Sequence, residues 1–202
     1  VCHVPHADDL LVIDAARQRG VAVTCEVTPH HLFLSNAAVD RLGAYARMKP
    51  PLVPPAEVAT FWERLDLVDA IASDHAPHTR AEKEGGTPPP GVPGLETTLP
   101  LLLHAADEGR LTLERVVALV HDNPLRIYGL RAPADTAVVV ELGAPYQLSF
   151  DGYRTRCGWS PFAGTWALGR VSRVRLRGTI VYEDGQVRVA GGYGRPLERA
   201  TE

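Results

Sequence analysis

Cysteine is scarce in this sequence, and its spacing excludes a disulfide-stabilised scaffold. The three cysteines are Cys2, Cys25 and Cys157; none forms a Cys-x-x-Cys motif, and any disulfide pairing leaves one of them over. Small secreted scaffolds instead carry an even number of closely spaced cysteines. We therefore expect reduced thiols and a cytoplasmic location.

Strong charge and long apolar runs are also missing. The net charge of −3 offers no basic surface for nucleic acid or an acidic membrane, so we expect neither as a partner. The longest apolar run, 99–106, is interrupted by Pro100 and His104 and is too short to cross a bilayer. The sequence starts with Val1-Cys2-His3-Val4, and this start shows no initiator methionine and no signal-like apolar segment. What is present is 45% hydrophobic residues, enough for a packed core.

The first two-thirds of the sequence alternates helical and β-type patterns. Apolar periodicity and capping residues predict helices at 8–19, 55–65, 95–107 and from 113 onward. Short β-branched runs predict strands at 22–27 and 68–73. Strands that alternate with helices favour parallel βα units, and hence an α/β fold.

The pattern changes near Leu130. Runs at 136–142, 171–177 and 179–189 are β-rich, and Glu183-Asp184-Gly185-Gln186 is a hairpin signal. The sequence therefore predicts two parts, an α/β part over 1–130 and a small antiparallel β subdomain over 131–202.

The α/β part is too small to be a complete parallel-sheet domain. It supplies about three parallel strands, whereas such a sheet needs covered faces and paired edges. Its first strand is already at its end at Cys2-His3. Either an upstream half lies outside this sequence or the fold is a smaller one, and we favour the first interpretation.

Three short motifs place possible metal ligands directly after an expected strand. They are Cys2-His3, the segment 25–31 and the segment 73–78. Residues at the carboxyl ends of strands in a βα barrel converge on one mouth, where the chemistry occurs. Imidazole from one strand and carboxylate from another suit zinc or a similar divalent ion.

The three motifs are not equally specific. A single histidine after a strand is more often structural, and His30 and His31 fit packing or capping as well as they fit ligation. Asp74 is stronger, because a carboxylate at the end of a buried strand is costly unless it is paired or bound to metal. For the charged run 80–84 we expect a solvated surface.

Five segments, taken in order, resemble signature blocks of dihydroorotases, of both the bacterial class I type and the animal multifunctional-protein type. These segments are 2–4, 23–32, 48–52, 73–78 and 90–97. Segments 159–162 and 176–187 also resemble the animal type. Hydantoinases and allantoinases share the fold and the strand-end aspartate, but not the Asp-His-Ala-Pro-His run with its Pro-Gly loop.

The resemblance implies a fold and a metal site. Residues 1–130 would be the C-terminal part, about strands six to eight, of a (β/α)8 TIM-type barrel of the metal-dependent amidohydrolase type. His3 would be a metal ligand, and Asp74 both a metal ligand and the catalytic proton shuttle. Cys2 and Glu26 match positions that can hold an additional zinc. The cofactor would be roughly one to three zinc ions.

The resemblance also implies substrate contacts. His78 and the backbone of Pro90 and Gly91 would hold the ring and carboxylate of the substrate. Lys49 occupies a position where relatives carry Asn or Arg as a substrate contact. A lysine there would meet the carboxylate as a point charge rather than as a fork.

The activity implied is the reversible, metal-dependent hydrolysis of dihydroorotate, which in pyrimidine biosynthesis runs as the cyclisation of N-carbamoyl-L-aspartate. The family's His-x-His pair, its bridging carboxylated Lys or Asp, and a further His ligand would all lie upstream of this sequence. Besides the small-molecule substrate, the implied partners are aspartate transcarbamoylase and a second copy in a homo-oligomer. Two alternatives stay open: a hydantoinase- or allantoinase-like enzyme, and an inactive dihydroorotase-like scaffold of aspartate transcarbamoylase.

Overall fold

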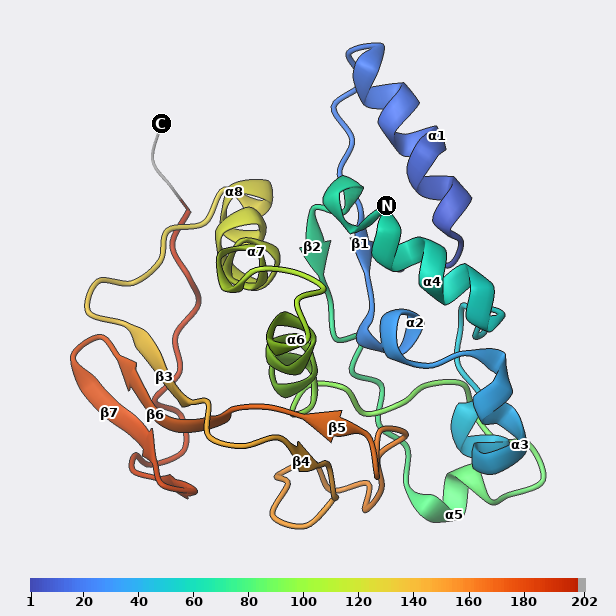
Figure 1. Ribbon diagram of the computed structural model, residues 1–202. Coiled ribbons are helices and arrows are strands. Elements are labelled where there is room, and N and C mark those ends of the chain that lie inside the picture. The colour runs from blue at the N-terminus through green and yellow to red at the C-terminus, as the bar shows by residue number, and fades with distance from the viewer. Residues whose placement is uncertain (200–202) are drawn as a thin grey trace.

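A computed structural model describes residues 1–199, and its first part is an α/β assembly around two short parallel strands. The elements of this part are α1 (Ala7–Gln18), β1 (Glu26–Val27), α2 (Pro29–Phe33), α3 (Val39–Leu42), α4 (Pro55–Glu63), β2 (Ala70–Ile71), α5 (Arg80–Lys83), α6 (Thr98–Asp107), α7 (Leu113–Val117) and α8 (Asn123–Tyr128). The alternation of strands and helices over this stretch confirms the expected α/β class (Figure 1).

The two strands form a parallel pair in which Glu26 lies opposite Ala70 and Val27 opposite Ile71. The segment 1–4 extends this arrangement, because the Glu26 amide donates to the Val1 carbonyl and the Val4 amide donates to the Glu26 carbonyl. Only two residues of each expected strand are paired in a ladder. The segment 1–4, which bends at His3, therefore lies beside the parallel pair of β1 and β2.

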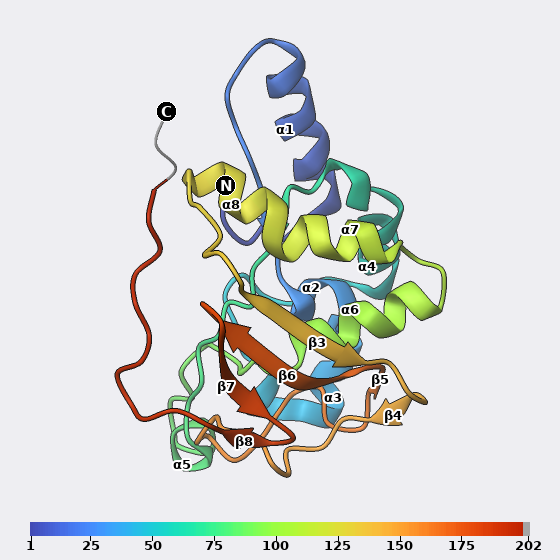
Figure 2. The ribbon, with the colours of Figure 1, turned by 90° about the vertical axis from the view of Figure 1, so that its left-hand side faces the viewer.

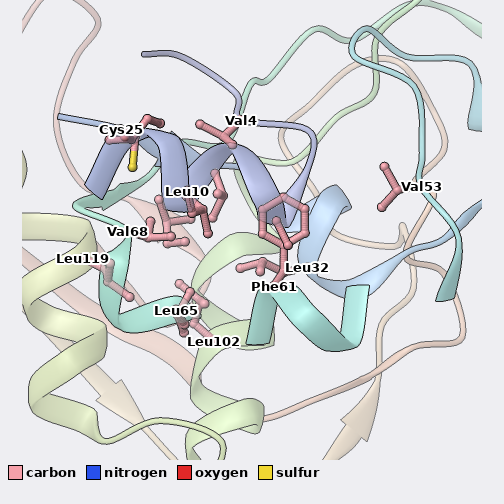
Figure 3. Packing of buried hydrophobic residues seen from close by; sticks show 14 of the residues in the cluster. Val4, Leu10, Cys25, Leu32, Val53, Phe61, Leu65, Val68, Leu102 and Leu119 are labelled. Atoms are coloured by element: carbon pink, nitrogen blue, oxygen red, sulfur yellow. The ribbon is translucent and has the colours of Figure 1, made fainter. Parts of the chain in front are cut away.

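The helices pack around the two strands and form a first hydrophobic core with them. Helix α1 packs against α4, and the π-helical turn 118–122 that follows α7 packs against β2. Leu10, Phe61 and Leu119 from these elements and Leu102 from α6 are completely buried in this core (Figure 3). Each such side chain contributes about 1.5–3 kcal/mol through burial. No helix within residues 1–199 combines the length and apolar character needed to cross a membrane.

The second part is antiparallel. A four-stranded sheet has the order β3 (Ala137–Glu141), β6 (Arg170–Leu176), β7 (Thr179–Glu183) and β8 (Gln186–Val187), and β4 (Tyr146–Gln147) pairs with β5 (Trp166–Ala167) (Figure 2). The expected hairpin is confirmed. Asp184 and Gly185 have φ of 46° and 79° between β7 and β8, as a two-residue hairpin turn requires.

A second core joins the tail to the α/β part. Buried Trp159 and Phe162 from the tail pack with Leu101 of α6 and with Met48 and Leu52 from the loop before α4. The stretch 146–168 is therefore packed against the α/β part, whereas β3, β6 and β7 lie farther out, at the left of Figure 1.

Candidate functional site

Three polar side chains lie together where the parallel segments end. His3 lies within the segment 1–4, Glu26 lies in β1, and Asp74 follows β2. His3 Nδ1 is 3.0 Å from Glu26 Oε1, and His3 Nε2 is 3.5 Å from Asp74 Oδ1. The three side chains are only partly exposed, at 30%, 15% and 25%. The structure thus brings together three of the residues that the sequence predicted for a metal site.

The backbone is strained at two of these positions. His3 and Asp74 have φ of 55° and 42°, in the left-handed region that few residues other than glycine adopt. Such a conformation costs on the order of 1–3 kcal/mol and persists only where the surrounding structure enforces it. Both strained residues end a parallel segment and face each other, which is the pattern expected where function rather than stability selects the conformation.

His30 joins this group from α2, and the sequence left its role open. Thr28 caps α2 by accepting from the His31 amide, and this holds His30 in a position with 1% exposure. His30 Nε2 lies 3.9 Å from Asp74 Oδ2, and neither ring nitrogen has a hydrogen-bond partner within residues 1–199. Burial, with smaller contributions from His31 and His3, lowers the pKa of His30 to about 3. The ring is therefore neutral at physiological pH, with an unused lone pair in the site.

His31 has a different role. Its Nδ1 is 2.7 Å from Thr28 Oγ1, and its Nε2 is 3.3 Å from the Pro51 carbonyl. Both histidines are buried, but only His31 has hydrogen-bond partners for its ring nitrogens, so the structural interpretation is better supported for His31 than for His30. Sequence reasoning could not separate them, because the two differ only in which side of a five-residue helix they occupy.

The donor chemistry of this group fits a divalent cation, but the number of donors falls short. A neutral buried imidazole with an unused nitrogen, facing a carboxylate, is a combination that zinc binds. Within residues 1–199, however, no three His, Cys, Asp or Glu side chains are arranged so that they could hold one ion. Cys2 is exposed and has a free thiol. The residues that the structure describes would therefore supply some, but not all, of the donors that a divalent cation needs.

A loop runs alongside the segment that carries Asp74. The Ala76 amide donates to the Val92 carbonyl, and the amides of Gly94 and Leu95 both donate to His75 Nδ1 at 3.2 and 3.1 Å. Because His75 Nδ1 accepts two hydrogen bonds, the proton of its neutral ring is on Nε2. These bonds fix the loop 90–95 beside the strand end.

Two of the predicted substrate residues, Pro90 and Gly91, lie on this loop, and His78 contacts it. His78 Nε2 is 3.2 Å from the Pro90 carbonyl, and the indole of Trp159 donates to the His78 carbonyl at 2.7 Å. Gly91 has a φ of 133°, and its amide donates to the Arg47 carbonyl at 2.9 Å. The structure therefore places His78, Pro90 and Gly91 together.

Two further observations concern the segments around this loop. Lys49 is exposed and lies two residues beyond Arg47, next to a cis bond to Pro50.

The expectation of a solvated surface at 80–84 is wrong for Lys83, whose side chain is completely buried. The missed signal is Thr79-x-x-Glu82, a capping box that starts α5 and directs the last residue of that helix inward.

Comparisons with known proteins give relatives in sequence and in structure. No protein-family model matches the chain. The chain is 45% identical to the multifunctional protein CAD of Squalus acanthias over 98% of its length, which is 9% of that protein. It is 39% identical to the dihydroorotase of Halobacterium salinarum over 94% of its length, which is 47% of that protein. The chain thus spans about half the length of the dihydroorotases it matches.

Solved structures show the same fold. The L-hydantoinase (dihydropyrimidinase) of Arthrobacter aurescens superimposes with a TM-score of 0.93 at 30% identity, over 98% of this chain and 48% of that one. The inactive dihydroorotase-like domain of a Chaetomium thermophilum CAD-like multifunctional protein gives 0.74 at 31% identity, over 93% and 52%.

Proposed function

We propose that this chain is the C-terminal part of a dihydroorotase. The premise is that the chain is related, over nearly its whole length, to part of the dihydroorotases. The observation that carries the proposal is the convergence of His3, Glu26, His30 and Asp74 at one edge of the parallel segments, beside a loop bearing His78 and Pro90-Gly91. The reaction proposed is the reversible hydrolysis of dihydroorotate to N-carbamoyl-L-aspartate.

The proposed architecture follows from the fold. Residues 1–130 would supply about strands six to eight of a (β/α)8 barrel, with the segment 1–4, β1 and β2 as those strands. Residues 131–202 would form the small β-rich subdomain. The parallel register of β1 and β2 and the superposition on the Arthrobacter aurescens enzyme support this assignment.

The proposed cofactor is zinc. His3 and Asp74 would hold it, with His30 as the additional donor that the structure brings near, and Cys2 and Glu26 would hold an additional ion. Because a catalytic zinc needs about three protein ligands, the remaining ones would come from the part of the relatives' length that this chain does not span. When bound, such an ion lowers the pKa of water and polarises a carbonyl group.

The residues of this chain would transfer protons and orient the substrate. The Asp74 carboxylate accepts a proton from the attacking water and delivers it to the departing ring nitrogen, which is general acid–base catalysis. In the direction of ring closure the same carboxylate moves the proton the opposite way. His78, the Pro90-Gly91 backbone and Lys49 orient the ring and carboxylate of the substrate, which reduces the entropy lost on reaching the transition state.

The test compares two aspartates that flank β2. Asp74→Asn in the complete enzyme should abolish turnover of dihydroorotate, because the amide cannot take up the proton. Asp69→Asn at the other end of β2 is the matched control. Asp69 pairs with Arg17 and accepts from the Cys25 amide, so this variant should lose stability but keep its kcat. Near-normal turnover by Asp74→Asn would refute the role of Asp74.

Two outcomes would favour the alternatives. Faster turnover of hydantoin or allantoin than of dihydroorotate by the unaltered enzyme would identify a hydantoinase- or allantoinase-like enzyme. No turnover of any of the three would identify an inactive scaffold, as in the Chaetomium thermophilum domain. The presence of His3, Asp74 and His78 favours the active enzyme. The similarity to CAD supports aspartate transcarbamoylase as a partner, and we further propose a homo-oligomer in the cytoplasm.

A further inference from the structure

A lysine behind the proposed substrate loop has no role in the reaction described so far. Lys83 is the last residue of α5, a four-residue helix that begins with a reciprocal capping box between Thr79 and Glu82. Its side chain is completely buried, which lysine almost never is unless its charge is compensated. No acidic side chain pairs with it within residues 1–199.

The compensation comes from backbone carbonyls. Lys83 Nζ donates to the carbonyls of Arg47, Pro89 and Gly91, each at 3.0 Å, so every N–H of the ammonium group is used. The ring of Trp159 lies 5.4 Å from Nζ and closes the site on another side. The pKa of Lys83 is lowered by burial and by the nearby Arg47, in keeping with a charge removed from water.

The three carbonyls belong to two segments that the proposed function requires close together. Pro89 and Gly91 flank Pro90, whose carbonyl faces His78. Arg47 precedes the exposed Lys49 by two residues, and its carbonyl also accepts from the Gly91 amide. One buried ammonium group therefore ties the Pro-Gly loop to the segment that carries Lys49.

An apolar side chain could fill this space without the cost of burying a charge. It could not hold three carbonyls at one point. We propose that Lys83 is a positioning residue that fixes the Pro90-Gly91 backbone relative to Lys49 and thereby sets the affinity of the enzyme for the substrate carboxylate. The inference rests on the proposed function and adds to it the residue that assembles the carboxylate-binding side of the site.

Arg115 provides a matched control. Its guanidinium also donates to three carbonyls, those of Leu65, Asp66 and Val68, at 2.8, 3.4 and 2.6 Å. These carbonyls precede β2, whereas the proposed site follows it. Lys83→Met and Arg115→Met each keep an unbranched side chain and remove a donor shared by three carbonyls. The Arg47 carbonyl keeps the Gly91 amide and the Leu65 carbonyl keeps the Val68 amide, whereas other carbonyls of each set lose the donor. Both variants should lower the unfolding midpoint, because carbonyls that lose a partner are costly where they are buried.

The experiment measures KM and kcat for dihydroorotate and for N-carbamoyl-L-aspartate in the complete enzyme. Lys83→Met should raise both KM values by about tenfold or more while kcat falls less, since a displacement of about 1 Å at a binding loop has effects of this size. Arg115→Met should leave KM unchanged. If Lys83→Met does not fold, Lys83→Gln, which keeps two N–H donors, is used in its place with the same expectation.

The outcomes separate the inference from the proposed function. An active unaltered enzyme in which the Lys83 and Arg115 variants have the same KM overturns the inference alone. A Lys83 variant that loses kcat with an unchanged KM overturns it as well. An unaltered enzyme that is inactive on dihydroorotate overturns the proposed function, and the inference with it.

Discussion

Gly91 gives the most direct test of whether the Pro-Gly loop is held as the structure shows. Its φ of 133° lies in a region that is essentially restricted to glycine, so any side chain there costs on the order of 1–3 kcal/mol. A Cβ atom would also lie 2.7 Å from the Ala76 carbonyl oxygen, 2.8 Å from the Ala76 Cβ and 3.2 Å from His78 Nε2. The first two are too close for any real contact, so the loop or the segment 74–78 must move.

Such overpacking adds about 1–3 kcal/mol. We therefore expect Gly91→Ala to lower the free energy of unfolding by about 2–5 kcal/mol, part of it relieved by displacement of the loop. Because that displacement moves the Pro90 carbonyl away from His78, KM for dihydroorotate should rise in the same variant.

Two other glycines separate the contributions. Gly109 has a φ of 75° and no atom within 4 Å of its Cβ position, so Gly109→Ala should cost only the conformational part, about 1–2 kcal/mol. Gly86 also has open space but no positive φ, so Gly86→Ala should be neutral or slightly stabilising. The assay is urea unfolding of the three variants in the same background, with KM measured in parallel. Equal losses for Gly91→Ala and Gly109→Ala would refute the close approach of the loop to Ala76.

Three further predictions follow from the same contacts. His78→Ala should raise KM strongly while metal content, measured by elemental analysis, stays intact; loss of zinc would show that His78 binds metal instead. Burial of the Glu96 carboxyl favours its neutral form, but hydrogen bonds from Thr155 and Arg154 outweigh burial and lower the pKa of Glu96. The ionised carboxylate therefore stabilises the fold above the unfolded pKa of ~4.3, and this stabilisation is lost as pH falls through the folded pKa. Melting temperatures between pH 5 and pH 3 should therefore fall less steeply in Glu96→Gln, and equal slopes would contradict this. Residues 1–202 expressed alone should be poorly soluble and bind no stoichiometric zinc, and a monodisperse zinc-containing species would be the contrary result.

The helices were largely predictable from the sequence, and the extent of strand pairing was not. Helices α1 and α4 lie within two residues of the expected 8–19 and 55–65, because local periodicity and proline at a first turn determine them. Residues 22–27 and 68–73 were expected to be strands throughout, but only two residues of each form a ladder. Pairing depends on which other segments lie alongside, and this is not encoded in the run itself.

The candidate site was predictable where a residue follows a strand directly. His3, Glu26 and Asp74 met as expected because adjacent parallel segments end at one edge. For His30 the sequence left packing and ligation both open, and for Lys83 it predicted a solvated side chain. His30 approaches Asp74 from a helix, and Lys83 is surrounded by carbonyls from residues 36, 6 and 8 positions away. In a charged run, a buried cation has the same local pattern as a solvated one, so only the fold distinguishes them.

The bond from the Trp159 indole to the His78 carbonyl has a consequence for dividing or recombining this protein. Trp159 lies beyond residue 131, yet its ring also packs against Tyr45 and stands over the Lys83 ammonium group. A chimera joined near residue 130 would exchange these contacts together with the β-rich tail. A donor sequence without an indole at that position would leave the His78 carbonyl without its indole donor. It would also remove the ring that lies against the Lys83 ammonium group. A boundary after residue 168 would keep the Trp159 contacts within one parent, but it would divide the four-stranded sheet between β3 and β6.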